Sequence, residues 1–198
     1  ESIVLLKNEG AILPLRENEH VAFIGGFVKH PRYQGGGSSH VNSFKVTSAW
    51  EALAGKEHIT HAEGFSAETD VYDEKLAAEA IQIAKQADKA IIFAGLPESF
   101  ESEGYDRKHM HLPECQNKLI AEITKVQPNT IVVLHNGAAV EMPWVNEVKG
   151  LVEAYLGGQA VGQATVNILY GMVNPSGKLA ETFPIKLEDN PSYLNFGD

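Results

Sequence analysis

Short apolar runs alternate with longer amphipathic stretches along most of this chain, and this alternation constrains the fold more than any other feature. Four of the runs are almost continuously apolar, at residues 21–25, 90–95, 130–134 and 150–155, and a weaker fifth run covers 58–63. Strands of this kind are expected where helices cover both faces of a parallel sheet. The pattern therefore predicts buried, mostly parallel strands.

The amphipathic stretches predict helices over residues 73–87, 113–126 and 160–169, with a shorter one over 47–53. Their apolar positions recur at the helical spacing of three and four residues. Strand–helix–strand alternation with short connections gives right-handed crossovers and a layered α/β fold. We therefore expect a three-layer α/β sandwich with a mostly parallel, doubly wound, flavodoxin-like sheet of about five or six strands.

Charge and composition exclude several classes of function. The 198 residues include 16 Lys and Arg against 26 Asp and Glu, a formal charge of −10, which argues against a nucleic-acid partner. No apolar run approaches the roughly 20 residues that span a bilayer, so a membrane protein is not expected. A single cysteine forms no internal disulfide, and the histidines lack a zinc-binding spacing, so we predict no metal and no cofactor.

Two connections are unusually long for such a fold, at residues 25–47 and 95–112. Both follow predicted strands, and ligands of open α/β sheets bind at the carboxyl ends of the strands. Loops of this length in a compact domain are more often functional than not. These two loops therefore hold the candidate site.

The first loop carries three glycines followed by hydroxyls, Gly35-Gly36-Gly37-Ser38-Ser39. Glycines permit a close approach of the backbone to a ligand. However, the dinucleotide fingerprint requires its glycines directly after the strand, and a P-loop requires a following lysine; neither condition is met here. Two interpretations of this segment remain open: a loop that contacts a polyol, and a plain surface turn.

The second loop crowds four carboxylates and one arginine into ten residues, from Glu98 to Arg107. Such a run is often only a solvated face. Phe100 and Tyr105 interleave with the acids, as in a sugar-binding cleft, and apolar surroundings raise the pKa of a carboxyl toward that of a general acid. Glu103 is the best candidate because the glycine after it lets the backbone turn. We also expect Asp106 and Arg107 to pair locally.

Seven short motifs follow one another along the chain. Each is weak by itself, but their common order makes the set specific for one family. They are residues 2–8 with 13–15, 21–25, 33–39, 103–107 with 112–113, 136–137 with 142–144, 174–179, and 182–184. In these motifs the chain resembles the C-terminal α/β sandwich domain of glycoside hydrolase family 3 enzymes, a group with many β-glucosidases. The resemblance runs almost from end to end.

The resemblance implies a function. Such enzymes hydrolyse β-linked terminal sugars with retention, in a cleft between a preceding (β/α)₈ barrel and this domain. It implies that the barrel supplies the nucleophile, that Glu103 is the general acid/base, and that the substrate is a β-linked oligosaccharide or an aryl or alkyl β-glucoside. The residues that it suggests for substrate contact are Ser38, Gly36, Gly37, Tyr105 and Arg107.

The same resemblance implies a domain organisation. Residues 1–20 would be the linker from a barrel that this sequence does not contain, and residues 21–198 the sandwich domain of a longer enzyme. Because only one of the two carboxylates would be present, we expect no turnover from the chain by itself. The alternatives are a flavodoxin-like module that binds a nucleotide or phosphate, and a non-catalytic structural domain. The compartment is left open, although the acidic charge and single cysteine favour a cytoplasmic bacterial enzyme.

Overall fold

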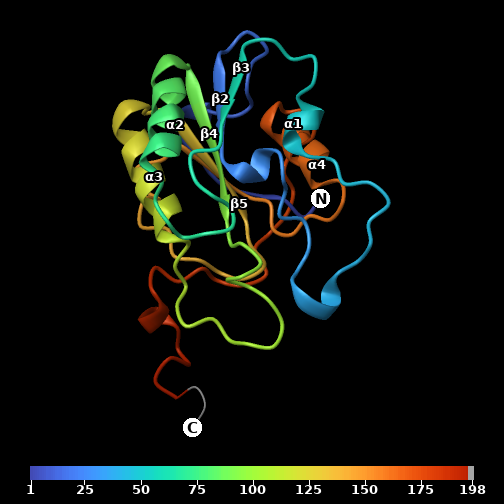
Figure 1. The fold of residues 1–198 in the computed structure, drawn as a ribbon, viewed down its shortest axis with the longest axis vertical. Coiled ribbons are helices and arrows are strands. Elements are labelled where there is room, and N and C mark those ends of the chain that lie inside the picture. Colours follow the sequence, from blue (N-terminus) through green and yellow to red (C-terminus); the bar gives the residue numbers. More distant parts are fainter. Residues whose placement is uncertain (196–198) are drawn as a thin grey trace.

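Six strands form one sheet between two helical layers in the computed structural model, which describes residues 1–195 (Figure 1). The strand order is β1-β6-β5-β4-β2-β3. The strands are β1 (Val4–Asn8), β2 (Val21–Ile24), β3 (Ile59–Ala62), β4 (Lys89–Gly95), β5 (Thr130–His135) and β6 (Gly150–Glu153). All neighbouring pairs are parallel except β1 with β6. The predicted α/β fold with a mostly parallel sheet is confirmed.

Helices cover both faces of the sheet. The longer ones are α2 (Glu74–Gln86) and α3 (Glu114–Val126) on one face, and α4 (Val161–Leu169) lies with the single-turn α1 (Ala49–Ala52) on the other (Figure 1). Short 3-10 turns occur at Glu9–Ala11, Gly26–Val28, Gly37–Ser39 and Leu187–Asp189. The ends of the predicted strands and helices agree with these bounds to within two residues, since apolar periodicity reports the buried face directly.

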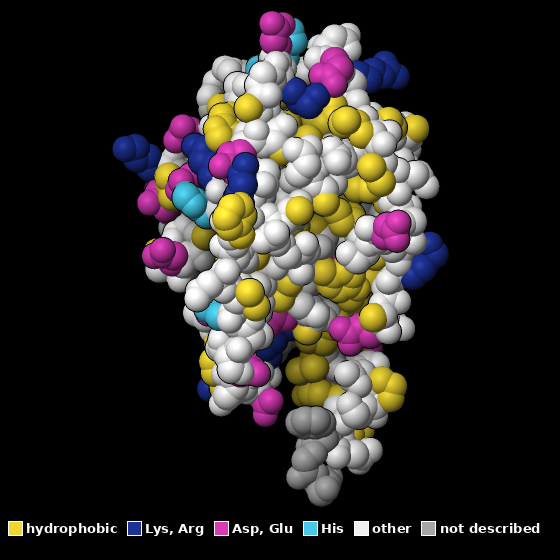
Figure 2. Space-filling model, turned by 90° about the vertical axis from the view of Figure 1, so that its right-hand side faces the viewer, with side chains coloured by type: hydrophobic (Ala, Val, Ile, Leu, Met, Phe, Trp, Pro, Cys, Tyr) yellow, Lys and Arg dark blue, Asp and Glu magenta, His cyan; other side chains and the backbone are white. Residues whose placement is uncertain are grey.

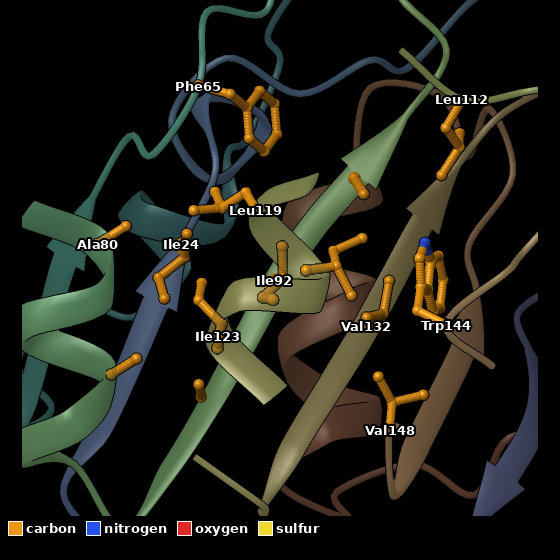
Figure 3. Packing of buried hydrophobic residues seen from close by; sticks show 14 of the residues in the cluster. Ile24, Phe65, Ala80, Ile92, Leu112, Leu119, Ile123, Val132, Trp144 and Val148 are labelled. Atoms are coloured by element: carbon orange, nitrogen blue, oxygen red, sulfur yellow. The ribbon is translucent and has the colours of Figure 1, made fainter. Parts of the chain in front are cut away.

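Alternation along each strand divides the core into two parts. In β2, Ala22 and Ile24 face α2 and α3, whereas Val21 and Phe23 face α1 and α4. Figure 3 shows the first part, in which Ile92 and Val132 of the sheet pack against Leu119 and other residues of the helical layer. Each large apolar side chain buried in this way contributes about 1.5–3 kcal/mol, so the two cores fix the layers and the edge of the sheet that they present.

The first twenty residues contribute to this sheet, which sequence analysis did not anticipate. Val4–Asn8 forms the edge strand β1, which runs antiparallel to β6, and Leu13 and Leu15 are buried in the core on the α4 side. Lys7 breaks the apolar run, so the segment lacks the pattern of the central strands. That the same residues also connect to a preceding barrel stays a prediction.

The order of the strands reverses between β2 and β4. From β2 the chain passes through α1 to β3 on one side, and from β4 it passes through α3 to β5 on the other. Gly25, directly after β2, and Gly95, the last residue of β4, have positive φ angles of 115° and 154°. A Cβ atom at Gly25 would collide with the carbonyl oxygen of Phe93, and one at Gly95 with that of His135. The long loops therefore start from a tightly packed switch point, where sheets of this class bind ligands.

Candidate active site

The two long loops meet at the carboxyl edge of the sheet, and the buried side chain of Arg32 joins them. Its Nε atom donates to the carbonyl oxygen of Leu96 (3.2 Å) and Nη2 to that of Glu101 (3.1 Å), while Nη1 donates to that of Gln34. Burial lowers the pKa of the guanidinium, an effect that the nearby charges of Glu101 and Glu98 oppose. Arg32 is the one arginine in the first loop, but nothing in the local sequence indicates its role.

Glycines bring the backbones of the two loops into contact. Gly36 forms an isolated parallel bridge with Ser102, and a Cβ atom on Gly36 would lie 2.7 Å from the Ser102 hydroxyl oxygen. Gly37 has a φ angle of 82°, and its Cβ would lie 3.0 Å from that of Glu103. In this structure, the lack of side chains at these glycines therefore allows the backbones of the two loops to approach each other closely.

Ser38 and Glu103 face each other across this contact, and both are exposed. The backbone N–H of Ser38 donates to Oε2 of Glu103 (2.7 Å), and the Ser38 hydroxyl donates to the same oxygen. Gly104 follows with a φ angle of 90°, which turns the chain at this point. Ser38 and Glu103, which the sequence placed in separate candidate loops, therefore lie side by side at the rim.

The expected raised pKa of Glu103 is wrong for this structure. The hydroxyl and then the backbone N–H of Ser38 lower the pKa of the carboxyl, because both hydrogen bonds favour its ionised form. The apolar surroundings that we expected around the carboxyl are absent, since the side chain is exposed and Phe100 packs against the α2–α3 core instead.

Tyr105 and Arg107 hold the second loop in shape. The half-exposed Tyr105 has its hydroxyl 2.8 Å from the carbonyl oxygen of Ser99. Arg107 donates through Nη1 to the carbonyl oxygen of Ala139 (3.0 Å), and burial lowers the pKa of its guanidinium. The expected pair of Asp106 with Arg107 is not formed within residues 1–195, because the arginine is drawn toward the 136–139 turn.

That turn also receives Glu101, whose two carboxylate oxygens accept from the N–H of Gly137 (2.8 and 3.1 Å). Beneath the turn, the carboxyl of Glu153 is fully buried, and burial raises its pKa to about 8. Glu153 is not among the candidate residues that the sequence suggests. The one sequence feature that could have pointed to it is that Glu153 is a single acidic residue within the apolar run 150–155.

Electrostatics disfavour the phosphate-binding alternative. The N–H group of Ser38, which a phosphate would need, already donates to a carboxylate, and Glu98 also lies against the glycine loop. Two carboxylates beside a phosphate would repel it. Within the described residues, no group of three or more His, Cys, Asp or Glu side chains could hold a metal ion. Among the same residues, none of the helices has the length and apolar character needed to cross a membrane.

Comparison with known proteins gives a consistent result over the whole chain. The family model "Glycosyl hydrolase family 3 C-terminal domain" matches residues 3–198. The chain is 54% identical to thermostable beta-glucosidase B of Acetivibrio thermocellus, over 99% of this chain and 26% of that protein. It is 42% identical to an exo-α-(1→6)-L-arabinopyranosidase of Bifidobacterium longum, over 99% of this chain and 27% of that protein.

The crystal structure of a GH3 beta-glucosidase from Bifidobacterium adolescentis matches with a TM-score of 0.94 and 43% identity, over 98% of this chain and 29% of that one. The chain thus spans about a quarter of the length of the curated relatives it matches. Because the family model covers nearly every residue and this chain aligns with these relatives over almost its whole length, it belongs to the glycosyl hydrolase family 3 C-terminal domains.

Proposed function

We propose that this chain is the part of a retaining, exo-acting β-glycosidase that carries the general acid/base, and that Glu103 is that residue. The observation that carries the proposal is the exposed carboxylate of Glu103 at the switch-point edge of the sheet, where two loops meet. Its place in the family motif at 103–107 and the names of the relatives support the same conclusion.

The neighbouring glutamates are less suited to this role. Glu101 is held by the N–H of Gly137, and Glu98 lies 2.9 Å from Nε2 of His40. Glu103 is held by the N–H and hydroxyl of Ser38, and the hydroxyl can rotate toward a sugar hydroxyl when substrate arrives. A carboxyl that exchanges its partner in this way can alternately donate and accept a proton, as the two steps of retention require.

The other candidate residues divide into two roles. Ser38 and the exposed part of Tyr105 are available to a sugar beside Glu103, and Gly36 and Gly37 bring Ser38 to that position. Arg107 is occupied by the carbonyl oxygen of Ala139, so we assign its first role to holding the loop. A direct contact of Arg107 with substrate stays a prediction.

The second carboxylate of the reaction would come from a companion N-terminal domain. Retention requires two carboxyl groups about 5–5.5 Å apart, one attacking the anomeric carbon and one protonating the leaving oxygen. The curated relatives are about four times as long as this chain, which leaves room for such a domain. The purified 198-residue chain should therefore release no nitrophenol from an aryl β-glucoside.

An exposed apolar surface on the first loop supports a companion domain. Phe44 is 100% exposed and Val41 is 65% exposed, and both lie beyond the Ser38 turn. Figure 2 shows the face of the molecule on which this loop projects, and hydrophobic side chains gather in the middle of that face. Exposed apolar groups beside a site are typical of a surface that another domain or a ligand covers.

The proposal is tested by the dependence of rate on the leaving group in the full-length protein. In Glu103→Ala, hydrolysis of an alkyl glycoside should fall by on the order of 10²–10⁴, because its leaving oxygen needs a proton. A dinitrophenyl glycoside should keep much of its glycosylation rate. Asp106→Ala, at an exposed acid of the same loop, is the matched control. The alkyl and dinitrophenyl glycosides of three sugars, β-D-glucose, β-D-xylose and α-L-arabinopyranose, serve as substrates. An unchanged leaving-group dependence in Glu103→Ala on all three sugars would overturn the proposal.

A further inference from the structure

The carboxyl group of Glu153, the last residue of β6, is completely buried at the carboxyl edge of the sheet. Its Oε1 atom accepts from the backbone N–H of Tyr155 (2.8 Å), and Oε2 accepts from Nδ2 of Asn136 (3.1 Å). Burying a carboxyl is costly even with partners, and a well-packed apolar residue would serve stability as well or better. A buried acid at this position is therefore better explained by the groups that it holds in place than by a gain in stability.

What Glu153 holds is the side chain of Asn136, the first residue after β5. The same Nδ2 atom of Asn136 donates to the carbonyl oxygen of Ala138 (3.0 Å). Asn136 is itself fully buried. Its amide is thus fixed by Glu153 on one side, and on the other it closes the turn of residues 136–139.

This turn anchors the loop of Glu103 at two points. Before Glu103, the carboxylate of Glu101 accepts from the N–H of Gly137. After Glu103, Arg107 donates to the carbonyl oxygen of Ala139. Glu103 lies between the two anchors, and its own hydrogen bonds are with Ser38 of the other loop. The position of its carboxyl therefore depends on the shape of the 136–139 turn.

The charge state of Glu153 suits this structural task. Burial raises its pKa to about 8, and the charge of Glu101 acts in the same direction, while the N–H donors of Tyr155 and Asn136 oppose it. At neutral pH the group is mostly uncharged. An uncharged acid holds Asn136 without placing a second negative charge beneath the site. A glutamine imitates it only in part, because it replaces one of the two accepting oxygens with an NH2 group.

We propose that Glu153 is a positioning residue for catalysis, which sets the location of Glu103 through Asn136 and the turn of residues 136–139. The inference rests on the proposed function, because the position of Glu103 matters to the rate only if Glu103 transfers the proton. Neither the family assignment nor the resemblance in sequence assigns a role to this residue.

The test compares two substrates in the full-length protein, one alkyl glycoside and one dinitrophenyl glycoside. A displaced acid slows only the substrate that needs protonation, and a misplacement of about 1 Å reduces such a rate by up to on the order of 10²-fold. In Glu153→Leu and in Asn136→Ala, we expect kcat/KM for the alkyl glycoside to fall at least about tenfold further than for the dinitrophenyl glycoside. Glu153→Gln, whose amide oxygen can still accept from Asn136, should keep a ratio closer to that of the wild type than Glu153→Leu does.

The ratio of the two rates separates positioning from folding, because loss of folded protein lowers both rates by the same factor. Thr165→Val, which removes a buried hydroxyl in α4 on the other face of the sheet, is the matched control and should leave the ratio unchanged. If Glu153→Leu yields no soluble protein, Asn136→Ala breaks the same link and decides the question. Equal losses on both substrates, or no loss, would overturn the inference.

The same measurements distinguish failure of the inference from failure of the proposed function. Glu103→Gln must itself lose rate selectively on the alkyl glycoside. If it does and the Glu153 and Asn136 variants do not, Glu153 has no positioning role and the proposed function stands. If Glu103→Gln shows no selective loss, both fail. In the double variant Glu103→Gln/Glu153→Leu, the ratio should be no more extreme than in Glu103→Gln alone.

Discussion

Ser38 donates two hydrogen bonds to one carboxylate oxygen of Glu103, one from its backbone N–H and one from its hydroxyl, and so joins the two long loops through residues that are 65 positions apart in sequence. Both hydrogen bonds stabilise the ionised carboxylate, and the pKa of Glu103 lies below its ordinary value for that reason. A general acid must instead hold a proton near neutral pH. For Glu103 to act as the proposed acid, substrate and a companion domain must therefore displace Ser38 from it and shield the carboxyl from water.

The first prediction concerns the pKa of Glu103 in the isolated chain. Ser38→Ala removes the hydroxyl, which is the larger of the two causes that lower the pKa, so the pKa should rise toward its ordinary value. A carbon-13 NMR titration of the Glu103 carboxyl measures this directly. Ser39→Ala is the matched control, because the Ser39 hydroxyl donates to the carbonyl oxygen of Gly36 and should leave the titration unchanged. An unchanged or lower pKa in Ser38→Ala would show that the hydroxyl does not hold the carboxylate.

The second prediction concerns how stability depends on pH through two buried groups. Burial raises the pKa of Glu153 from its ordinary value of 4.5 to about 8, and it lowers the pKa of His135 from 6.5 to about 4. Folded Glu153 keeps a proton that the unfolded chain releases, so its contribution falls as pH rises from 4.5 to 8. Unfolded His135 binds a proton that the folded state lacks, so its contribution is lost as pH falls from 6.5 to 4.

The two contributions oppose each other between pH 4.5 and 6.5, and Glu153 acts alone from 6.5 to 8. There the free energy of unfolding should fall by up to about 1.4 kcal/mol per pH unit. Urea unfolding of the chain at a series of pH values measures this slope, and Glu153→Gln should abolish it. Glu57→Gln, at an exposed site, is the control. A slope above pH 6.5 that persists in Glu153→Gln would contradict the assignment.

The third prediction concerns Arg32, whose side chain donates hydrogen bonds to three backbone carbonyl oxygens in the two loops. Arg32→Met leaves these carbonyls without their donor and should lower the free energy of unfolding by about 1–3 kcal/mol. It should also make the 96–112 loop more sensitive to proteolysis. Arg16→Met, at an exposed position, should change stability by less than about 0.5 kcal/mol. Equal effects of the two substitutions would mean that Arg32 does not hold the loops together.

The fourth prediction concerns Phe44, whose side chain is fully exposed in this chain. Phe44→Ser should leave the stability of the isolated chain within about 0.5 kcal/mol of the wild type, because it loses no buried contact. In the full-length protein it should lower activity, because the companion domain or substrate would cover this side chain. Met172→Ser, at another exposed apolar position, is the control and should leave activity unchanged. Full activity in Phe44→Ser would argue against this contact.

The sequence predicted those parts of the fold that local patterns determine. The five strands from β2 to β6 and the helices α1 to α4 follow from apolar periodicity, because each of them buries a face of its own. The edge strand β1 was missed because Lys7 interrupts its pattern and its pairing is with residues near position 150. An edge strand is stabilised mainly by its partner, and a local pattern cannot show the partner.

For the candidate site, the sequence predicted the edge of the sheet at which it lies but not the contacts between its residues. Both long loops follow strands of a parallel sheet, so the sequence placed Ser38 and Glu103 at its carboxyl edge, and only the structure shows that they touch. The roles of Arg32 and Glu153 were not visible, because each acts through hydrogen-bond partners distant in sequence. The direction of the Glu103 pKa was wrong for the same physical reason, since the hydroxyl that lowers it belongs to the other loop.

The most direct test of the account is the product that the full-length Glu103→Ala variant forms from a dinitrophenyl glycoside in the presence of azide. Without an acid/base, water attacks the glycosyl-enzyme slowly, whereas azide needs no proton removed. The account predicts accelerated turnover and a glycosyl azide with the anomeric configuration of the substrate, identified by proton NMR. Formation of that azide by Glu101→Ala, with none from Glu103→Ala, would contradict it.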